Sequence, residues 1–280
     1  MPDHRRVKEI VFQAVIVILT FLTIAPLLHI ISSVFVKGLP VLIRGGISFL
    51  TDTLAPPSDG LGGVGPAILG TFVLMFLSSL MGLPIALMAG IYSAEYPRSI
   101  VGRATKILLQ IMMEFPTILV GLFAMELLVI PIGSYSALAG AFALAIIMMP
   151  YVAISTEEAL KEIPKTYREA AFSLGLSRVQ VVFRVLIKMA KRGTLTGILI
   201  GMAKVAGETA PLLFTAGGSE RIYFLGLDRP IGAIPLLIYQ LIQQPYDNYH
   251  QIAWGASLLL MLIFLGIFIP TTLKLREVKF

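Results

Sequence analysis

The chain has 280 residues, of which 57% are hydrophobic and 14% charged, whereas roughly 25% of the residues of a soluble domain are charged. The apolar residues occur in long blocks, which places most of the chain in a lipid bilayer. The absence of cysteine excludes disulfide bonds and thiolate metal sites, and the three histidines lie too far apart in the sequence to predict a metal centre.

Six segments approach the roughly 20 apolar residues that cross a bilayer. We therefore predict an all-α integral membrane protein with one transmembrane domain over residues 1–280 and six transmembrane helices. The predicted spans are Ile10–Val36, Ala67–Ile91, Ile107–Ile130, Ala137–Ile154, Leu195–Ala216 and Ile252–Leu273. A shorter apolar run, Ile231–Ile242, contains Gly232 and Pro235 and is predicted as a re-entrant or surface helix on the outer side.

Lysine and arginine are distributed unevenly between the connections of these spans. Seventeen lie at the two chain ends or in the connections after the second and fourth spans, and four lie in the other connections. Because cations are enriched on the cytoplasmic side of membrane proteins, both chain ends are predicted to lie in the cytoplasm. The net charge of +6 is explained by this topology, and no nucleic-acid binding is expected.

A polar connection between the fourth and fifth spans carries an ordered pattern. Pro164 suits a first helical position, Gly175 suits the left-handed residue after a helix, and Ser177 suits the N-cap of a second helix. Glu169, Ala170, Ala171 and Gly175 together resemble the EAA loop of ATP-binding-cassette (ABC) importer permeases, although Lys188 stands where that pattern has proline. The alternative interpretation is an ordinary amphipathic loop helix.

The EAA resemblance implies that residues 155–193 form a cytoplasmic loop that docks onto an ATPase. The residues that it places at this contact are Tyr167, Arg168, Glu169, Ala170, Ala171 and Gly175. Ala170 and Ala171 give the helix a face with little side-chain bulk, which suits insertion into a groove of another protein.

One cation, Lys204, lies deep inside a predicted span, and Glu208 follows it by four residues on the same helical face. Ionisable groups at membrane depth usually face a partner or a wet cavity. Two interpretations stay open: a neutralising structural pair, or a cation that lines the path of an anion. Glu114 and Glu126 also lie in or near spans, and neither is assigned a role.

Glycine recurs every four residues at Gly193, Gly197 and Gly201 in the fifth span. Rows of small residues let membrane helices approach closely. The row predicts a packing seam, whose partner is either another span or another subunit.

The run from Ala203 to Ala216, with Gly207-Glu208-Thr209-Ala210-Pro211 at its centre, is similar to a signature of the PstA family of phosphate importer permeases. Similar segments are Pro56–Gly60, Ala89–Tyr96, Pro116–Phe123 and Gln251–Trp254. The family usually has arginine where this chain has Lys204, so the charge is kept without the planar fork that binds phosphate through two bonds.

This resemblance implies a type I ABC importer permease fold and a multi-pass location in a bacterial or archaeal plasma membrane. It implies import of inorganic phosphate with a paralogous permease (PstC), two ATPases (PstB) and a phosphate-binding protein (PstS). Lys204, Glu208 and Thr209 would line the substrate path.

A nucleotide site is not expected in the chain itself. Gly65–Thr71 has the glycine spacing of a P-loop but no lysine before the threonine, so ATP would be hydrolysed by a partner and this chain would need no cofactor. Two other classes remain as alternatives: a secondary oxyanion transporter or channel without an ATPase, and an intramembrane enzyme using Ser78, Ser79 or Ser155. No base is paired with any of these serines in the sequence.

Overall fold

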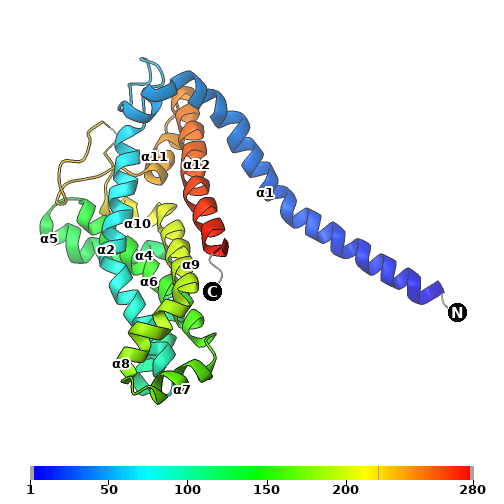
Figure 1. Ribbon diagram of the computed structural model, residues 1–280. Coiled ribbons are helices and arrows are strands. Elements are labelled where there is room, and N and C mark those ends of the chain that lie inside the picture. The colour runs from blue at the N-terminus through cyan, green and yellow to red at the C-terminus, as the bar shows by residue number, and fades with distance from the viewer. Residues whose placement is uncertain (1–2, 220, 278–280) are drawn as a thin grey trace.

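The computed structural model describes residues 3–219 and 221–277, and in this part of the chain the regular elements are helical (Figure 1). Two short segments, η1 and η2, are π-helical. The elements are α1 (Asp3–Thr51), α2 (Gly65–Glu95), α3 (Ile100–Glu114), α4 (Thr117–Ala124), η1 (Met125–Val129), α5 (Ile130–Ile132), α6 (Ala137–Lys161), α7 (Lys165–Ser173), α8 (Arg178–Gln180), η2 (Val181–Leu186), α9 (Ile187–Ala206), α10 (Ala210–Thr215), α11 (Ile234–Ile242) and α12 (Asp247–Glu277). The prediction of an all-α protein is confirmed for these residues.

Four helices of the described chain are long and apolar enough to cross a membrane, namely α1, α2, α6 and α12. The segment from α3 to α5 adds a fifth candidate, which is bent by 102°. The segment of α9 and α10 does not meet the same length and hydropathy criteria. Helix length and hydropathy therefore support four or five spans, whereas the sequence predicts six.

The third predicted span is not one continuous helix. Its first half lies in α3 and its second half in α4 and η1, and the chain bends sharply at Phe115 and Pro116. Phe115 has extended backbone angles, φ −73° and ψ 131°. A residue before proline is disfavoured in the helical conformation because the proline ring contacts its backbone, so Pro116 ends α3 and the chain restarts as α4.

The fifth predicted span is also interrupted. Helix α9 ends at Ala206, and α10 begins at Ala210 with Pro211 in its first turn. Proline has no N–H group to bond to the carbonyl four residues earlier, which is that of Gly207, and its ring would clash with this carbonyl in a continuous helix. Gly207, Glu208 and Thr209 therefore form a break, which we call the α9–α10 break.

The fourth span is longer than predicted, because α6 continues past Ile154 to Lys161. The predicted loop 155–193 therefore starts inside α6 and ends inside α9. The true connection consists of α7, α8 and η2, which form one tip of the molecule (Figure 1). We call this tip the α7 end.

Helix α1 extends away from the rest of the molecule over its first half (Figure 1). The apolar side chains from Ile10 to Phe35 are largely exposed on all sides of the helix, as is typical of a helix that faces lipid or another chain. Gly46, with φ 52°, kinks the helix. Only the part near this kink packs on the body, against α12.

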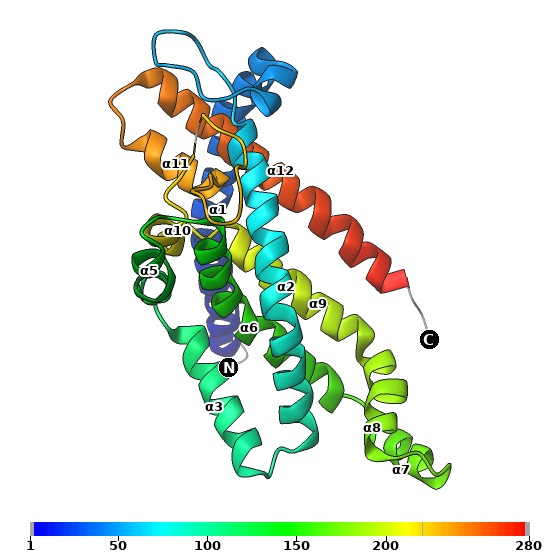
Figure 2. The same ribbon diagram turned by 90° about the vertical axis from the view of Figure 1, so that its left-hand side faces the viewer.

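The centre of the molecule is formed by α2, α6 and α9 (Figure 2). The row of small residues on α9 packs on α6. A Cβ atom added at Gly193 would lie 2.5 Å from Ala159 Cβ, and one added at Gly201 would lie 2.8 Å from Val152 Cγ2. The predicted seam is thus confirmed, and its partner is α6 of the same chain.

Candidate coupling surface and anion site

The two ends of α7 follow the local sequence signals. Gly175 has φ 79°, and its N–H donates to the carbonyl of Phe172 at 2.9 Å. Ser177 caps α8 by accepting a hydrogen bond from the Gln180 N–H, and its own N–H donates to Oε1 of Gln180 at 2.9 Å. The predictions for Gly175 and Ser177 are confirmed, and Pro164 lies one residue before the first helical residue.

The six residues predicted to contact an ATPase divide between two faces of the loop. Tyr167, Glu169, Ala170 and Gly175 are exposed, and the exposed side chains of Phe172 and Leu174 extend the same surface. We call the exposed residues of this loop the coupling surface, which consists of Tyr167, Glu169, Ala170, Phe172, Leu174 and Gly175. The sequence prediction did not include Phe172 and Leu174, although both are apolar residues in a polar loop and could have been noticed for that reason.

The other two predicted contact residues, Arg168 and Ala171, face the body of the protein, and their part in an ATPase contact stays a prediction. Ala171 is 5% exposed and belongs to a buried apolar cluster that also contains Ala94 of α2, Leu160 of α6 and Val182 of η2. Arg168 lies three residues earlier and hence on the same side of the helix. The small side chain of Ala171 therefore serves the packing of α7 on its own chain.

Arg168 is bonded to two helices at once. Its Nη1 atom forms an ion pair with Oε1 of Glu95, the last residue of α2, at 2.9 Å. Its Nη2 atom donates a hydrogen bond to the carbonyl of Leu160 in the last turn of α6 at 3.1 Å. The guanidinium therefore joins α7 to the ends of both α2 and α6.

A second ionic cluster lies close by in α6. Glu157 is 3% exposed and forms ion pairs with Lys161 on its own helix and with Lys106 of α3, the latter at 3.7 Å. The sequence prediction missed this cluster. The spacing of Glu157 and Lys161 was a readable signal, whereas the contact with Lys106 depends on the fold.

Lys204 and Glu208 form an ion pair, with 2.5 Å between Nζ and Oε1. Lys204 lies in the last turn of α9, and its side chain is 39% exposed. Glu208 lies in the α9–α10 break, and its side chain is 9% exposed. Thr209, the third predicted path residue, is half-buried at the N-cap of α10. The carboxylate is thus held in the protein while the ammonium group reaches the surface.

The other interrupted span, formed by α3 and α4, packs beside the α9–α10 segment. Helices α4 and α10 are in contact, and a Cβ atom added at Gly121 of α4 would lie 2.6 Å from the Cα atom of Pro211. Discontinuous helices at membrane depth are tolerated where they are buried in protein or line a cavity. Helix α4, which follows the bend at Pro116, therefore packs against α10 at the residues that follow the α9–α10 break.

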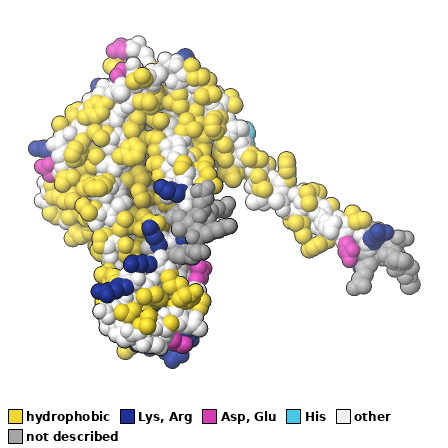
Figure 3. All heavy atoms as spheres, viewed as in Figure 1, with side chains coloured by type: hydrophobic (Ala, Val, Ile, Leu, Met, Phe, Trp, Pro, Cys, Tyr) yellow, Lys and Arg dark blue, Asp and Glu magenta, His cyan; other side chains and the backbone are white. Residues whose placement is uncertain are grey.

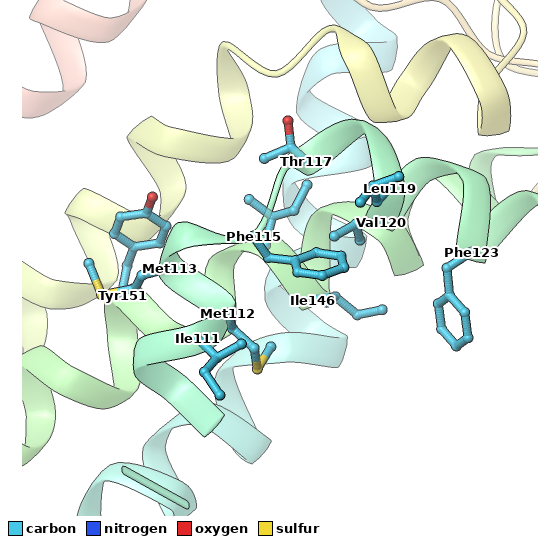
Figure 4. Close-up of a pocket in the computed structure, with 11 residues that line it drawn as sticks. Ile111, Met112, Met113, Phe115, Thr117, Leu119, Val120, Phe123, Ile146 and Tyr151 are labelled. Atoms are coloured by element: carbon cyan, nitrogen blue, oxygen red, sulfur yellow. The ribbon is translucent and has the colours of Figure 1, made fainter. Parts of the chain in front are cut away.

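A cavity of about 360 Å³ is lined by α3, α4 and α6 (Figure 4). Its walls are apolar except for two hydroxyl groups, those of Thr117 and Tyr151, which are drawn on the side nearest the ribbon of α9 and α10. An apolar cavity does not offset the loss of hydration of an anion. We therefore do not assign it as the anion site.

A second, polar groove of about 520 Å³ follows the seam of α6 and α9 toward the α7 end. Arg192, Thr196 and Ile200 line it from α9, and Lys204 continues the same helical face at the same spacing of four residues. Ser155, Glu158 and Glu162 line it from α6. The exposed side of the seam therefore presents polar groups from the α7 end up to Lys204.

Comparison with known proteins identifies the family. Residues 82–273 match the family of binding-protein-dependent transport system inner membrane components. The chain is 56% identical over 273 residues to the probable phosphate transport system permease protein PstA of Methanocaldococcus jannaschii, covering 98% of this chain and 95% of that one. It is 37% identical over 251 residues to PstA of Haemophilus influenzae, covering 89% and 87%.

Solved structures support the same fold at lower identity. The MetNI methionine ABC transporter in an inward-facing conformation aligns with a TM-score of 0.60 and 21% identity over 78% of this chain and 95% of that one. An amino acid ABC transporter aligns with a TM-score of 0.53 and 20% identity over 87% and 96%. With this shared fold and the PstA relatives, the chain belongs to the PstA family of permease subunits, within the binding-protein-dependent transport system inner membrane components.

Proposed function

We propose that this permease subunit forms, with a second permease, the path by which inorganic phosphate enters a bacterial or archaeal cell. The observation that carries the proposal is the 56% identity, over nearly the whole chain, to a relative named as a phosphate transport permease. Family members are permeases rather than enzymes, and the ATPase of such a transporter is a separate subunit. We therefore assign no cofactor to this chain and attribute ATP hydrolysis to partner subunits.

The proposed topology has six crossings with both chain ends in the cytoplasm. Helices α1, α2, α6 and α12 each make one crossing, and the interrupted segments α3–α4 and α9–α10 make the other two. Lysine and arginine gather over α8 and the adjoining part of α9, while the rest of the visible face is largely hydrophobic (Figure 3). This distribution supports a cytoplasmic α7 end.

Accessibility labelling tests this topology. A cysteine at Ser58, in the connection between α1 and α2, should react with an impermeant reagent in intact cells. A cysteine at Ser177 should react only after the membrane is permeabilised. Labelling of Ser177 from outside would refute the six-crossing arrangement.

The proposed partners are a PstC-like permease, two PstB-like ATPases and a PstS-like phosphate-binding protein. We assign the ATPase contact to the coupling surface, because an exposed apolar patch rimmed by polar residues is typical of a protein interface. In the proposed mechanism, closure of the ATPases displaces α7, and the attached helices alternate the access of the central path between the two membrane faces.

In this mechanism Lys204, Glu208 and Thr209 line the substrate path. Transfer of phosphate out of water is costly, and a nearby cation offsets part of that cost. Glu208 neutralises Lys204 while the path is empty and competes with phosphate for it when the path is full. This competition keeps the site weak enough to release the anion, as conduction requires.

Transport by the complete reconstituted complex tests the proposed function. Liposomes that contain both permeases and the ATPases, supplied with binding protein and ATP, should accumulate radioactive phosphate. Excess arsenate should compete more strongly than sulfate or molybdate, because arsenate shares the shape and protonation of phosphate. Uptake of sulfate or molybdate in preference to phosphate would contradict the assignment.

The same liposomes distinguish the alternative of a secondary transporter or channel. Under the proposal, phosphate accumulation needs both the ATPase subunits and ATP. Accumulation by the two permeases alone, driven by an ion gradient, would favour the alternative instead.

A further inference from the structure

We infer that Arg168 is the positioning residue that transmits the movement of α7 to the membrane helices, by joining α7 to the ends of α2 and α6. The inference rests on the proposed function, since it concerns how ATP hydrolysis is coupled to transport. Arg168 belongs to the loop that resembles the EAA motif, but its side chain turns away from the coupling surface and toward the protein itself.

The chemistry of the site suits a fixed connection. An arginine side chain presents several donors in a rigid plane and can bond to two acceptors in a defined geometry. Here Nη2 donates a hydrogen bond to the carbonyl of Leu160 at 3.1 Å, and Nη1 forms an ion pair with a carboxylate oxygen of Glu95 at 2.9 Å. Both lie in the last turn of a helix, where the carbonyl groups carry partial negative charge.

The connection is partly shielded from water. The side chain of Glu95 is 9% exposed and that of Arg168 is 23% exposed. Water therefore competes less for this pair than for the surface pairs of the chain. Removing one partner of such an ion pair lowers the stability of the protein, because the other charge then remains buried without compensation.

Arg168 is also the single polar link between α7 and these two helices among the residues that the structure describes. The remaining packing of α7 is apolar, through Ala171, in a buried cluster that also contains residues of α2, α6 and η2. An apolar contact has no preferred direction and allows sliding. The bonds of Arg168 fix the position of α7 along the ends of α2 and α6.

The route from this link to the candidate anion site is continuous. Leu160 lies in α6, one residue from Ala159, which packs against Gly193 of α9. The seam of α6 and α9 continues to Gly201, and Lys204 follows within one turn. Physical continuity alone does not demonstrate coupling, so the test must measure coupling directly.

The test compares ATP hydrolysis and phosphate uptake in the same preparation of the complete complex in liposomes. Arg168→Gln removes the charge while keeping a polar, although shorter, side chain. We expect ATP hydrolysis to stay within about twofold of the wild type, and the ATP consumed per phosphate transported to rise at least about fivefold. Arg168→Lys keeps the charge but has a single nitrogen atom in place of the planar fork, and it should restore part of the coupling.

Glu95→Gln provides an independent variant that leaves the bond from Arg168 to Leu160 in place. It should raise the ratio of ATP consumed to phosphate transported. The double variant should have the same ratio as Arg168→Gln alone, because Arg168→Gln already breaks the ion pair with Glu95. Arg184→Gln is the matched control. Arg184 is an exposed arginine of η2, without an ion pair in the described chain, and its replacement should leave the ratio unchanged.

The outcomes separate this inference from the proposed function. Phosphate uptake by the wild-type complex tests the function, whereas the ratio in the variants tests the role of Arg168. If Arg168→Gln prevents assembly, Glu95→Gln decides: a raised ratio supports the inference. An unchanged ratio in an assembled Glu95→Gln complex, or equal loss of hydrolysis and uptake in every variant, would overturn it.

Discussion

Two ion pairs of this protein have nearly the same chemistry but occupy very different positions in the fold. Lys204 and Glu208 are four residues apart on one segment of chain, whereas Arg168 and Glu95 come from helices that are far apart in the sequence. In both pairs the carboxylate is 9% exposed. The pair on one segment can open without separating any helices, so its cation is free to meet a ligand. The pair between helices cannot open without loosening α7 from α2, which suits a mechanical role.

The largest effect is expected when the ion pair of Lys204 and Glu208 is broken. We expect Lys204→Ala to reduce phosphate uptake by about 100-fold or more, because an anion in a low-dielectric path without a cation costs several kcal/mol. Uptake by the assembled complex in liposomes measures this effect. Loss of Lys204 also leaves Glu208 without its ion-pair partner, and that alone could destabilise the protein.

The double variant Lys204→Ala with Glu208→Ala removes this ambiguity. If the pair is only structural, removing both charges should restore stability and uptake. If Lys204 serves the anion, the double variant should assemble normally and remain inactive. Near-normal uptake by a well-assembled double variant would refute the transport role of Lys204.

The next effect concerns the packing seam of α6 and α9, which connects the α7 end with Lys204. Gly197→Leu should force α9 away from Ser155 of α6, since overpacking a close helix contact costs about 1–3 kcal/mol or more. We expect less assembled complex after detergent extraction and a lower thermal midpoint. Gly266→Leu in α12 is the matched control, because a Cβ atom there meets nothing within 4 Å. Equal amounts of assembled complex and equal thermal midpoints in the two variants would contradict close packing of α9 on α6 at Gly197.

A third effect distinguishes the two faces of α7. Ala171→Trp should lower the thermal stability of the permease itself by about 1–3 kcal/mol, because it overpacks the contact with α2 and α6. Ala170→Trp should leave that stability unchanged and reduce only the recovery of ATPase with the complex. Thermal unfolding of the permease and co-purification of the ATPase provide the two measurements. The reverse result would place Ala171 on the coupling surface.

The smallest effect concerns the turn after α7. Gly175→Val should cost about 1–2 kcal/mol, because a β-branched residue is strained at positive φ, and it should weaken ATPase recovery moderately. Gly175→Asn should recover most of the loss, since asparagine tolerates this conformation. ATPase recovery at increasing salt or temperature would resolve the difference. Identical recovery with valine and asparagine would show that the turn does not position the coupling surface.

The sequence predicted the features that depend on residues close to one another along the chain. The end of α7 at Gly175 and the cap at Ser177 depend on neighbouring residues, and both were predicted correctly. The pairing of Lys204 with Glu208 was predicted from their spacing of four residues, and it forms although Glu208 lies just beyond the end of α9. The spans around Pro116 and Pro211 were predicted as continuous helices, whereas both are interrupted in the structure.

The remaining features depend on contacts that no local pattern contains. Helical spacing places Arg168 and Ala171 on one face, but only the packed structure shows that this face points inward. The partners of Arg168 and of Glu157 include residues from α2 and α3, which the fold brings to the α7 end. A single sequence carries no signal that pairs these residues.

The contact between α1 and α12 has a consequence for biosynthesis. Lys37 lies 4.6 Å from the centre of the Trp254 ring, and Arg44 donates to Gln251 across 207 residues of chain. At roughly 5–20 residues per second, the partner of α1 leaves the ribosome about 10–40 s after α1 itself. The first helix must therefore wait in the membrane for the last one. We expect a chain that stops at residue 246 to be degraded faster than the full chain in a pulse–chase experiment, and equal lifetimes would contradict this order of folding.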